Sequence, residues 1–147
     1  MNRRHLALIV LLGATISMGA SKGCSCHWST AKITDAVMSA GVDKTVHPTN
    51  KTNVFKPNQG KIYCIVYLKH CPKGTNVSVK WKFLGGPAGG PKAGDIDSTK
   101  KGNVHGSGRL AFSLTKAPGK SWPVGKYAVE ISLNGKKDRT VSFEVKP

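Results

Sequence analysis

The residues best suited to chemistry stand close together near the N-terminus. Cys24, Cys26 and His27 place two thiols and an imidazole within four positions. Thiolates and imidazoles are ligands that suit Cu(I) and Zn(II). Three ligands do not close a structural zinc site, and the gap of one residue between the cysteines is shorter than the usual spacing. The pattern therefore favours a simple tether, without a metal or other cofactor, over a metal- or redox-handling cluster.

The rest of the chain shows no recognisable catalytic constellation. The glycines around Ser107 lack the spacing of a nucleophile elbow. Asp95 and Asp97 offer two carboxylates, whereas calcium takes six to eight oxygen ligands. With only 7 Asp and Glu residues in 147, little material remains for acid–base chemistry. We therefore predict that the protein is not an enzyme.

Residues 1–23 have the order of a secretory signal peptide. A short basic stretch at 2–5 precedes an apolar run at 6–16, and mostly small residues follow at 17–21. This order is typical of an exported chain. The apolar run is also shorter than the roughly 20 residues that a membrane-spanning helix needs. We predict a periplasmic, extracellular or envelope-tethered protein with no transmembrane span after cleavage.

Residues 24–32 are expected to form an N-terminal tether. Cys24 stands where a bacterial lipoprotein carries its acylated cysteine. The residues before it match a lipobox poorly, because Lys22 replaces a small residue and no aliphatic residue stands three positions before the cysteine. Lipidation at Cys24 and ordinary cleavage near Ala20 or Gly23 therefore both stay open.

Four cysteines in an exported chain predict disulfides rather than free thiols. Cys64 and Cys71 are the pair within the body of the chain, where a bond would staple the end of one strand to the following turn. Cys24 and Cys26 stand too close for an unstrained mutual bond. Four cysteines permit three pairings, and their spacing does not decide between them. The Cys64–Cys71 disulfide is the pairing that we predict.

The body of the chain, residues 33–147, has the pattern of a run of short β-strands. Alternating apolar positions and β-branched residues predict strands at 33–40, 61–68, 76–84, 109–114, 126–133 and 140–145. The first of these also fits a short helix. Both faces of 61–68 are mostly apolar, so we expect it in the middle of a sheet. In 76–84 the apolar residues alternate, which defines one buried face.

Glycine and proline mark the connections between these strands. Residues 72–74 are predicted to turn the chain, and 85–108 to form a long mobile loop with at most one short edge strand. Asn134-Gly135 is the preferred pair for a two-residue type I′ hairpin. Crossover helices are missing from the pattern, so about seven strands imply an all-β, two-layer antiparallel sandwich.

A segment near the C-terminus carries a recognisable motif. Residues 121–136 read S-W-P-V-G-K-Y-A-V-E-I-S-L-N-G-K. This resembles the end of small exported bacterial Ig-like domains, in which W-P-x-G-x-Y precedes an alternating strand and an N-G-K hairpin. F-K-P at 55–57, K-I-Y-C at 61–64 and V-K-W at 79–81 fit the same type. The resemblance covers about 33–145, and implies an Ig-like β-sandwich with an adhesive, accessory or scaffold role and no catalytic residues.

Three aromatic residues have structural roles in this picture. Trp81 is the expected central core residue. Tyr127 lies near the start of a late strand, where its hydroxyl can tie back the neighbouring loop as a tyrosine corner does. Trp122, next to Pro123, is expected to cap one end of the core, and the alternative is a surface ring that stacks on a ligand.

Charge is the remaining functional lead. The chain has 23 Lys and Arg against 7 Asp and Glu, a formal net charge of +16. After the signal peptide, most of these basic residues are lysines. Lysine lacks the planar, forked guanidinium with which arginine binds the edges of bases, so we expect no sequence-specific nucleic-acid binding. Envelope or extracellular polyanions, or another envelope protein, are the expected partners. The expected polyanion contacts are Lys80, Lys82, Lys100 and Lys101. Lysines that only keep edge strands soluble are an equally good interpretation.

Two functional hypotheses follow. The first is an exported, non-catalytic Ig-like domain that acts as a binding or structural accessory at the cell envelope through polyanion contacts. The alternative is a metal- or redox-handling lipoprotein that uses Cys24, Cys26 and His27. Salt-dependent retention on heparin would support the first hypothesis, and stoichiometric Cu(I) or Zn(II) binding that C26S abolishes would support the second.

Overall fold

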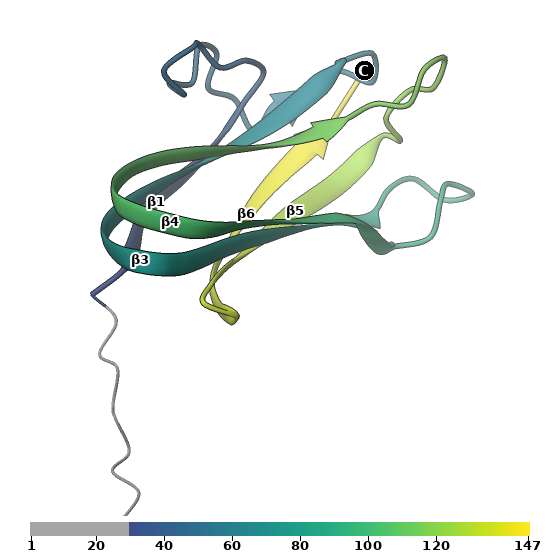
Figure 1. Cartoon of the computed structure of the whole chain (residues 1–147). Helices are drawn as coiled ribbons and strands as arrows, with labels where there is room; N and C mark the ends of the chain where they lie inside the picture. The colour runs from purple at the N-terminus through teal and green to yellow at the C-terminus, as the bar shows by residue number, and fades with distance from the viewer. Residues whose placement is uncertain (1–29) are drawn as a thin grey trace, which may run out of the picture.

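Strands make up most of the chain that the computed structural model describes, residues 30–147. In chain order (Figure 1) they are β1 (Lys32–Ser39), β2 (Val54–Phe55), β3 (Lys61–Gly85), β4 (Gly94–Thr115), β5 (Gly125–Leu133) and β6 (Lys136–Val145). These residues form no helix, so the all-β prediction is confirmed, and no membrane-crossing helix is found in this part of the chain. The predicted signal peptide and most of the predicted tether lie outside the described residues.

The six strands form one continuous, curled sheet in which β3 is the central element. Their order is β1-β3-β5-β6-β2, and β4 pairs with β3 outside this path. All pairs are antiparallel except β2 with β6. The first part of β3, residues 61–68, lies between β1 and β4, and its second part, 77–85, lies between β4 and β5. The strand predicted at 61–68 therefore does lie inside the sheet, which explains why it is apolar on both faces.

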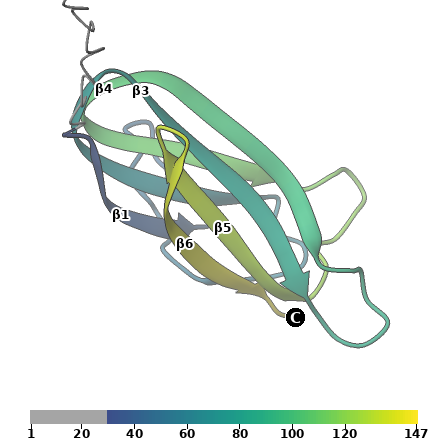
Figure 2. The ribbon, with the colours of Figure 1, turned by 90° about the horizontal axis from the view of Figure 1, so that it is seen from below.

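β3 and β4 form one long hairpin that bends midway along its length. Register shifts mark the bend, as bulges do where paired strands turn. His70 and Gly74 in β3 have φ of 53° and 89°, and Asn103 and Gly106 in β4 have φ of 56° and 78°. These left-handed positions let both strands change direction together, side by side, as Figure 2 shows. The predicted turn at 72–74 thus bends the chain, but the strand continues through it.

The prediction of a long loop at 85–108 is mostly wrong. Only residues 86–93 join β3 to β4, and from Gly94 onward the chain pairs with β3. This part of β4 is an edge of the sheet with mostly exposed side chains. Its backbone pairing, rather than side-chain burial, makes it a strand, so it shows no apolar alternation. Lysines and bulges are typical of such edges, since they discourage pairing with other chains.

The curl of the sheet encloses one hydrophobic core. Trp81 is fully buried, and Val66 from the first part of β3 belongs to the same cluster of side chains. The ring of Phe143 lies edge-on to Trp81, with 6.1 Å between centroids, and stacks on Tyr127 at 4.9 Å. Both parts of the bent hairpin therefore contribute to the same core.

Hydrogen bonds fix the two aromatic residues of the W-P-V-G-K-Y segment. The Tyr127 hydroxyl donates to the Pro123 carbonyl at 2.6 Å, the bond that a tyrosine corner requires. Burial raises the pKa of Tyr127 to about 12, so the hydroxyl keeps its proton at neutral pH. Trp122 is buried, and its Nε1 donates to the Gln59 carbonyl at 2.6 Å. Trp122 thus closes one end of the core.

The predicted Cys64–Cys71 disulfide is not formed. Both residues are buried free cysteines. Because β3 continues through residues 69–76 instead of reversing, the seven steps between the two cysteines run along one strand. That separation exceeds the 4.4–6.8 Å between Cα atoms that a disulfide spans. Burial raises the pKa of the Cys64 thiol to about 12, so it stays protonated and unreactive near neutral pH.

The β5–β6 hairpin has the predicted turn. Asn134 and Gly135 have φ of 51° and 81°, and a type I′ turn needs positive φ at both positions. The Asn134 side chain also accepts the backbone N–H of Asn76 at 2.9 Å, which ties the turn to β3. The hairpin tip therefore has a fixed position beside the bend.

Candidate polyanion-binding surface

Lys80 and Lys82 lie on the face of β3 that points away from the core, and both have carboxylate partners. Lys80 Nζ lies 3.3 Å from a carboxylate oxygen of Asp95 in β4. Lys82 Nζ lies 3.1 Å from Glu130 in β5, and Lys137 in β6 contacts the same Glu130 oxygen at 2.9 Å. We call these five residues the paired face. Its three ammonium groups meet two carboxylates, so it offers little free positive charge.

Glu130 holds this arrangement together at ordinary pH. Its hydrogen bond from Lys137, and next that from Lys82, lower the pKa of Glu130 below its usual value of 4.5. The carboxylate is therefore ionised throughout the neutral range. A polyanion that approached Lys82 or Lys137 would have to displace it.

Lys100 and Lys101 point to different places. Lys100 stands opposite Ser78 and lines a polar hollow of about 400 Å³, which Lys80 and Glu130 of the paired face also line. Lys101 Nζ donates to the Ala111 carbonyl at 2.6 Å and lies 5.2 Å from the centroid of the Phe112 ring. It thus links the two parts of β4. Of the four lysines expected to act together, Lys80 and Lys100 line one hollow that also contains Glu130. Lys82 is bonded to that Glu130, and Lys101 makes a structural contact within β4.

A second group of lysines was missed by the sequence analysis. Lys61 pairs with Thr115, the Lys116 amide donates to the Gly60 carbonyl at 3.0 Å, and the Trp122 amide donates to the Pro57 carbonyl at 2.9 Å. These bonds place residues 56–61 beside 115–122. We call the resulting group the lysine end, and it consists of Lys56, Lys61, Lys116 and Lys120.

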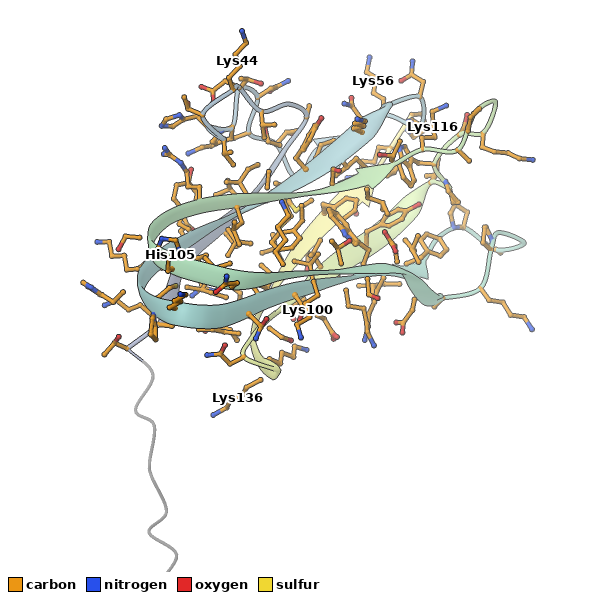
Figure 3. The ribbon with its side chains drawn as sticks, in the orientation of Figure 1. Lys44, Lys56, Lys100, His105, Lys116 and Lys136 are labelled. Carbon is orange, nitrogen blue, oxygen red and sulfur yellow. The ribbon has the colours of Figure 1, made fainter. Side chains whose placement is uncertain are left out.

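The lysine end contains no carboxylate of its own. Neither residues 56–61 nor 115–122 include Asp or Glu, and none of the ion pairs found within residues 30–147 involves these four lysines. Lys116 Nζ donates to the Lys120 carbonyl, and Figure 3 shows Lys56 and Lys116 at the same end of the molecule. Here no ion pair within residues 30–147 offsets the positive charge.

An apolar hollow of about 430 Å³ lies elsewhere on the surface. Its lining includes Val54 and Leu84, two exposed apolar side chains, together with Lys126 and Glu144. Glu144 is itself bonded to Lys146 at 2.7 Å. The lining also includes Tyr127 and Ser142.

Metal-binding groups do not gather in the described part of the chain. Within residues 30–147, no set of three or more His, Cys, Asp or Glu side chains could hold a metal ion. The predicted weak cluster of Cys24, Cys26 and His27, and the predicted lipidation site at Cys24, lie outside the described residues.

No family model matches the chain, and no curated protein matches it significantly. Among solved structures, the chain is similar to Pseudomonas fluorescens alkylpurine DNA glycosylase AlkC bound to DNA containing an abasic site analog, with a TM-score of 0.47 and 14% identity. It is also similar to β-D-glucoside glucohydrolase from Trichoderma reesei, with a TM-score of 0.46 and 13% identity. Each match covers 81% of this chain, but only 31% and 19% of the respective neighbour. Likenesses this weak carry no inference about function.

Proposed function

We propose that this chain is an exported, non-catalytic Ig-like β-sandwich that binds polyanions at the cell envelope as an accessory module. The Ig-like interpretation is supported by the Tyr127–Pro123 hydrogen bond and by a buried Trp81 on the strand that crosses the core. The bent β3–β4 hairpin supports it too, because its two parts pair with different strands and contribute to one core.

The uneven pairing of charges carries the functional proposal. Asp95 and Glu130 compensate lysines on the paired face, whereas the lysine end has four lysines and no acid in either of its segments. Like charges held together repel each other, and a polyanion would relieve that repulsion while releasing its own counterions. The partner should be a flexible acidic chain, because lysine ammonium groups act as point charges without a fixed hydrogen-bond fork.

Heparin affinity, measured at several salt concentrations, tests this proposal. The triple variant K56Q/K61Q/K120Q removes three charges from the lysine end and keeps Lys116, whose side chain bonds the loop. On nucleic acids the slope of log affinity against log salt changes by about 0.7–0.9 per contact. We expect the variant to flatten the slope by about two.

A matched control removes the same charge elsewhere. K44Q/K100Q/K136Q changes three lysines that Figure 3 shows on other parts of the surface. We expect this control to reduce the slope by less than half as much. Equal losses in the two triples would mean that attraction is diffuse, and no retention of the unmodified protein would overturn polyanion binding altogether.

A further inference from the structure

The bend of the β3–β4 hairpin carries a second set of unpaired lysines. Lys32 in β1 stands directly opposite Lys69 in β3, and Lys73 follows within the bend. All three are exposed. We call Lys32, Lys69 and Lys73 the basic bend. It uses none of the lysines of the lysine end.

The Lys32–Lys69 pair is unfavourable without an external anion. Residues directly opposite in an antiparallel ladder have Cβ atoms about 4.5–5.5 Å apart, and like charges there destabilise the sheet. Neither residues 69–76 nor 101–107 contain Asp or Glu. Asp35 is the nearest acid along β1 and forms no ion pair with either lysine, and Asp138 beside β1 is bonded to Arg139. No ion pair found within residues 30–147 relieves the repulsion.

The described chain enters the fold at this same place. The Thr30 hydroxyl donates to the His70 carbonyl at 2.8 Å, so the first described residue is held against the bend. Five residues separate Cys24 from Thr30, and the six steps between their Cα atoms reach at most about 20 Å. A chain tethered to a membrane at Cys24 would therefore hold the bend within that distance of the bilayer.

We propose that the basic bend docks on an anionic phospholipid surface. Three exposed lysines that form no ion pair within residues 30–147 complement lipid phosphates, and a tether at Cys24 would hold this end near the membrane. The inference depends on the envelope location in the proposed function, and it adds a second partner that other residues contact. Each lysine near an anionic bilayer contributes roughly a fivefold gain in binding.

Vesicle co-sedimentation tests the docking directly. The processed chain from an exporting host would carry C24S to prevent acylation, and would be mixed with vesicles of phosphatidylglycerol and phosphatidylcholine or of phosphatidylcholine alone. We expect binding only to the anionic vesicles. K32Q/K69Q/K73Q should weaken it on the order of 100-fold, and K56Q/K61Q/K120Q by only a few-fold.

A single variant separates binding from folding. Lys69→Glu places opposite charges across the β1–β3 ladder, so it should raise the melting temperature while lowering vesicle binding. A loss of stability together with a loss of binding would point to a structural role for Lys69 and would count against docking.

The remaining outcomes distinguish this inference from the proposed function. Equal weakening by both triple variants would show diffuse attraction and overturn the role of the bend. Heparin retention without vesicle binding would also overturn it, but would leave the proposed function in place. If the bend variants lose heparin affinity and no vesicle binding is seen, the bend binds a soluble polyanion and not a bilayer.

Discussion

The paired face and the lysine end carry the same kind of side chain in opposite electrostatic settings. On the paired face, Lys80 and Lys82 stand on one strand, and the neighbouring strands supply Asp95 and Glu130. The lysine end is built from two loops whose sequences contain no acid. The number of lysines on a surface therefore says little about anion binding until the carboxylates around each lysine are placed.

The two regions also differ in how they are held. The paired face lies on four strands of the sheet, β3 to β6, so its geometry follows from the sheet. The lysine end depends on contacts between loops, above all the hydrogen bonds of Trp122 with Gln59 and Pro57. Changes that loosen these loops should therefore affect the lysine end before they affect the paired face.

The largest expected effect comes from Trp122→Ala. Removing a buried tryptophan typically costs about 3–5 kcal/mol of unfolding free energy, and Trp122 is buried at the junction of the two loops. We expect a loss of about 3 kcal/mol by urea denaturation, with weaker heparin binding in the protein that remains folded.

Trp81 provides the matched control for this change. Its Nε1 is buried without a hydrogen-bond partner, whereas Trp122 Nε1 donates to the Gln59 carbonyl. Trp122→Phe therefore loses a hydrogen bond of about 1 kcal/mol that Trp81→Phe does not. Weaker heparin binding in Trp81→Phe than in Trp122→Phe would contradict the role given to Trp122 in holding the lysine end.

A smaller effect is expected when the paired face is converted into an unpaired one. Glu130→Gln removes the carboxylate that both Lys82 and Lys137 contact. Two freed ammonium groups should raise heparin affinity several-fold at low salt and steepen its salt dependence by about one to two. Stability should change little, as is usual for exposed ion pairs.

Thr140→Val is the control for Glu130→Gln, because it changes a neighbouring side chain without changing the charge. Thr140 stands directly opposite Glu130 in β6 and carries no charge, so its replacement should leave heparin affinity unchanged. Unchanged affinity in Glu130→Gln would mean that the lysines of the paired face do not contact heparin even when they are free.

The buried face of the second part of β3 could be predicted from the sequence, and the lysine end could not. Alternation in 76–84 identifies buried residues because each strand position alternates between faces, and Trp81 is indeed fully buried. Lys56 and Lys120 are far apart in the sequence, and only the loop contacts bring their segments together. The sequence pattern predicts which residues of one strand share a face, but it does not predict which distant loops lie side by side.

The edge strand β4 and the bend of β3 were not predicted, for a related reason. The strand from Gly94 onward is fixed by its backbone pairing with β3, which leaves no signature in side-chain type. The bend at 69–76 contains proline and glycine, which usually mark a reversal. Here the positive φ of His70 and Gly74 redirects a strand that stays paired, and the disulfide predicted from a reversal at that point is not formed.

The smallest effect is expected from pH. The pKa of Glu130 is lowered in the folded state by its bonds from Lys137 and Lys82. Such a group adds stability at pH values above its unfolded pKa, near 4.5, and loses this contribution as pH falls through the lower folded pKa. The melting temperature should therefore fall slightly more in the unmodified protein than in Glu130→Gln as the solution is acidified below that value.

Protonation of Glu130 also frees Lys82 and Lys137, so acidification should bring the heparin affinity of the unmodified protein toward that of Glu130→Gln. Two affinity curves that stay parallel on acidification would show that Glu130 does not control the charge of the paired face.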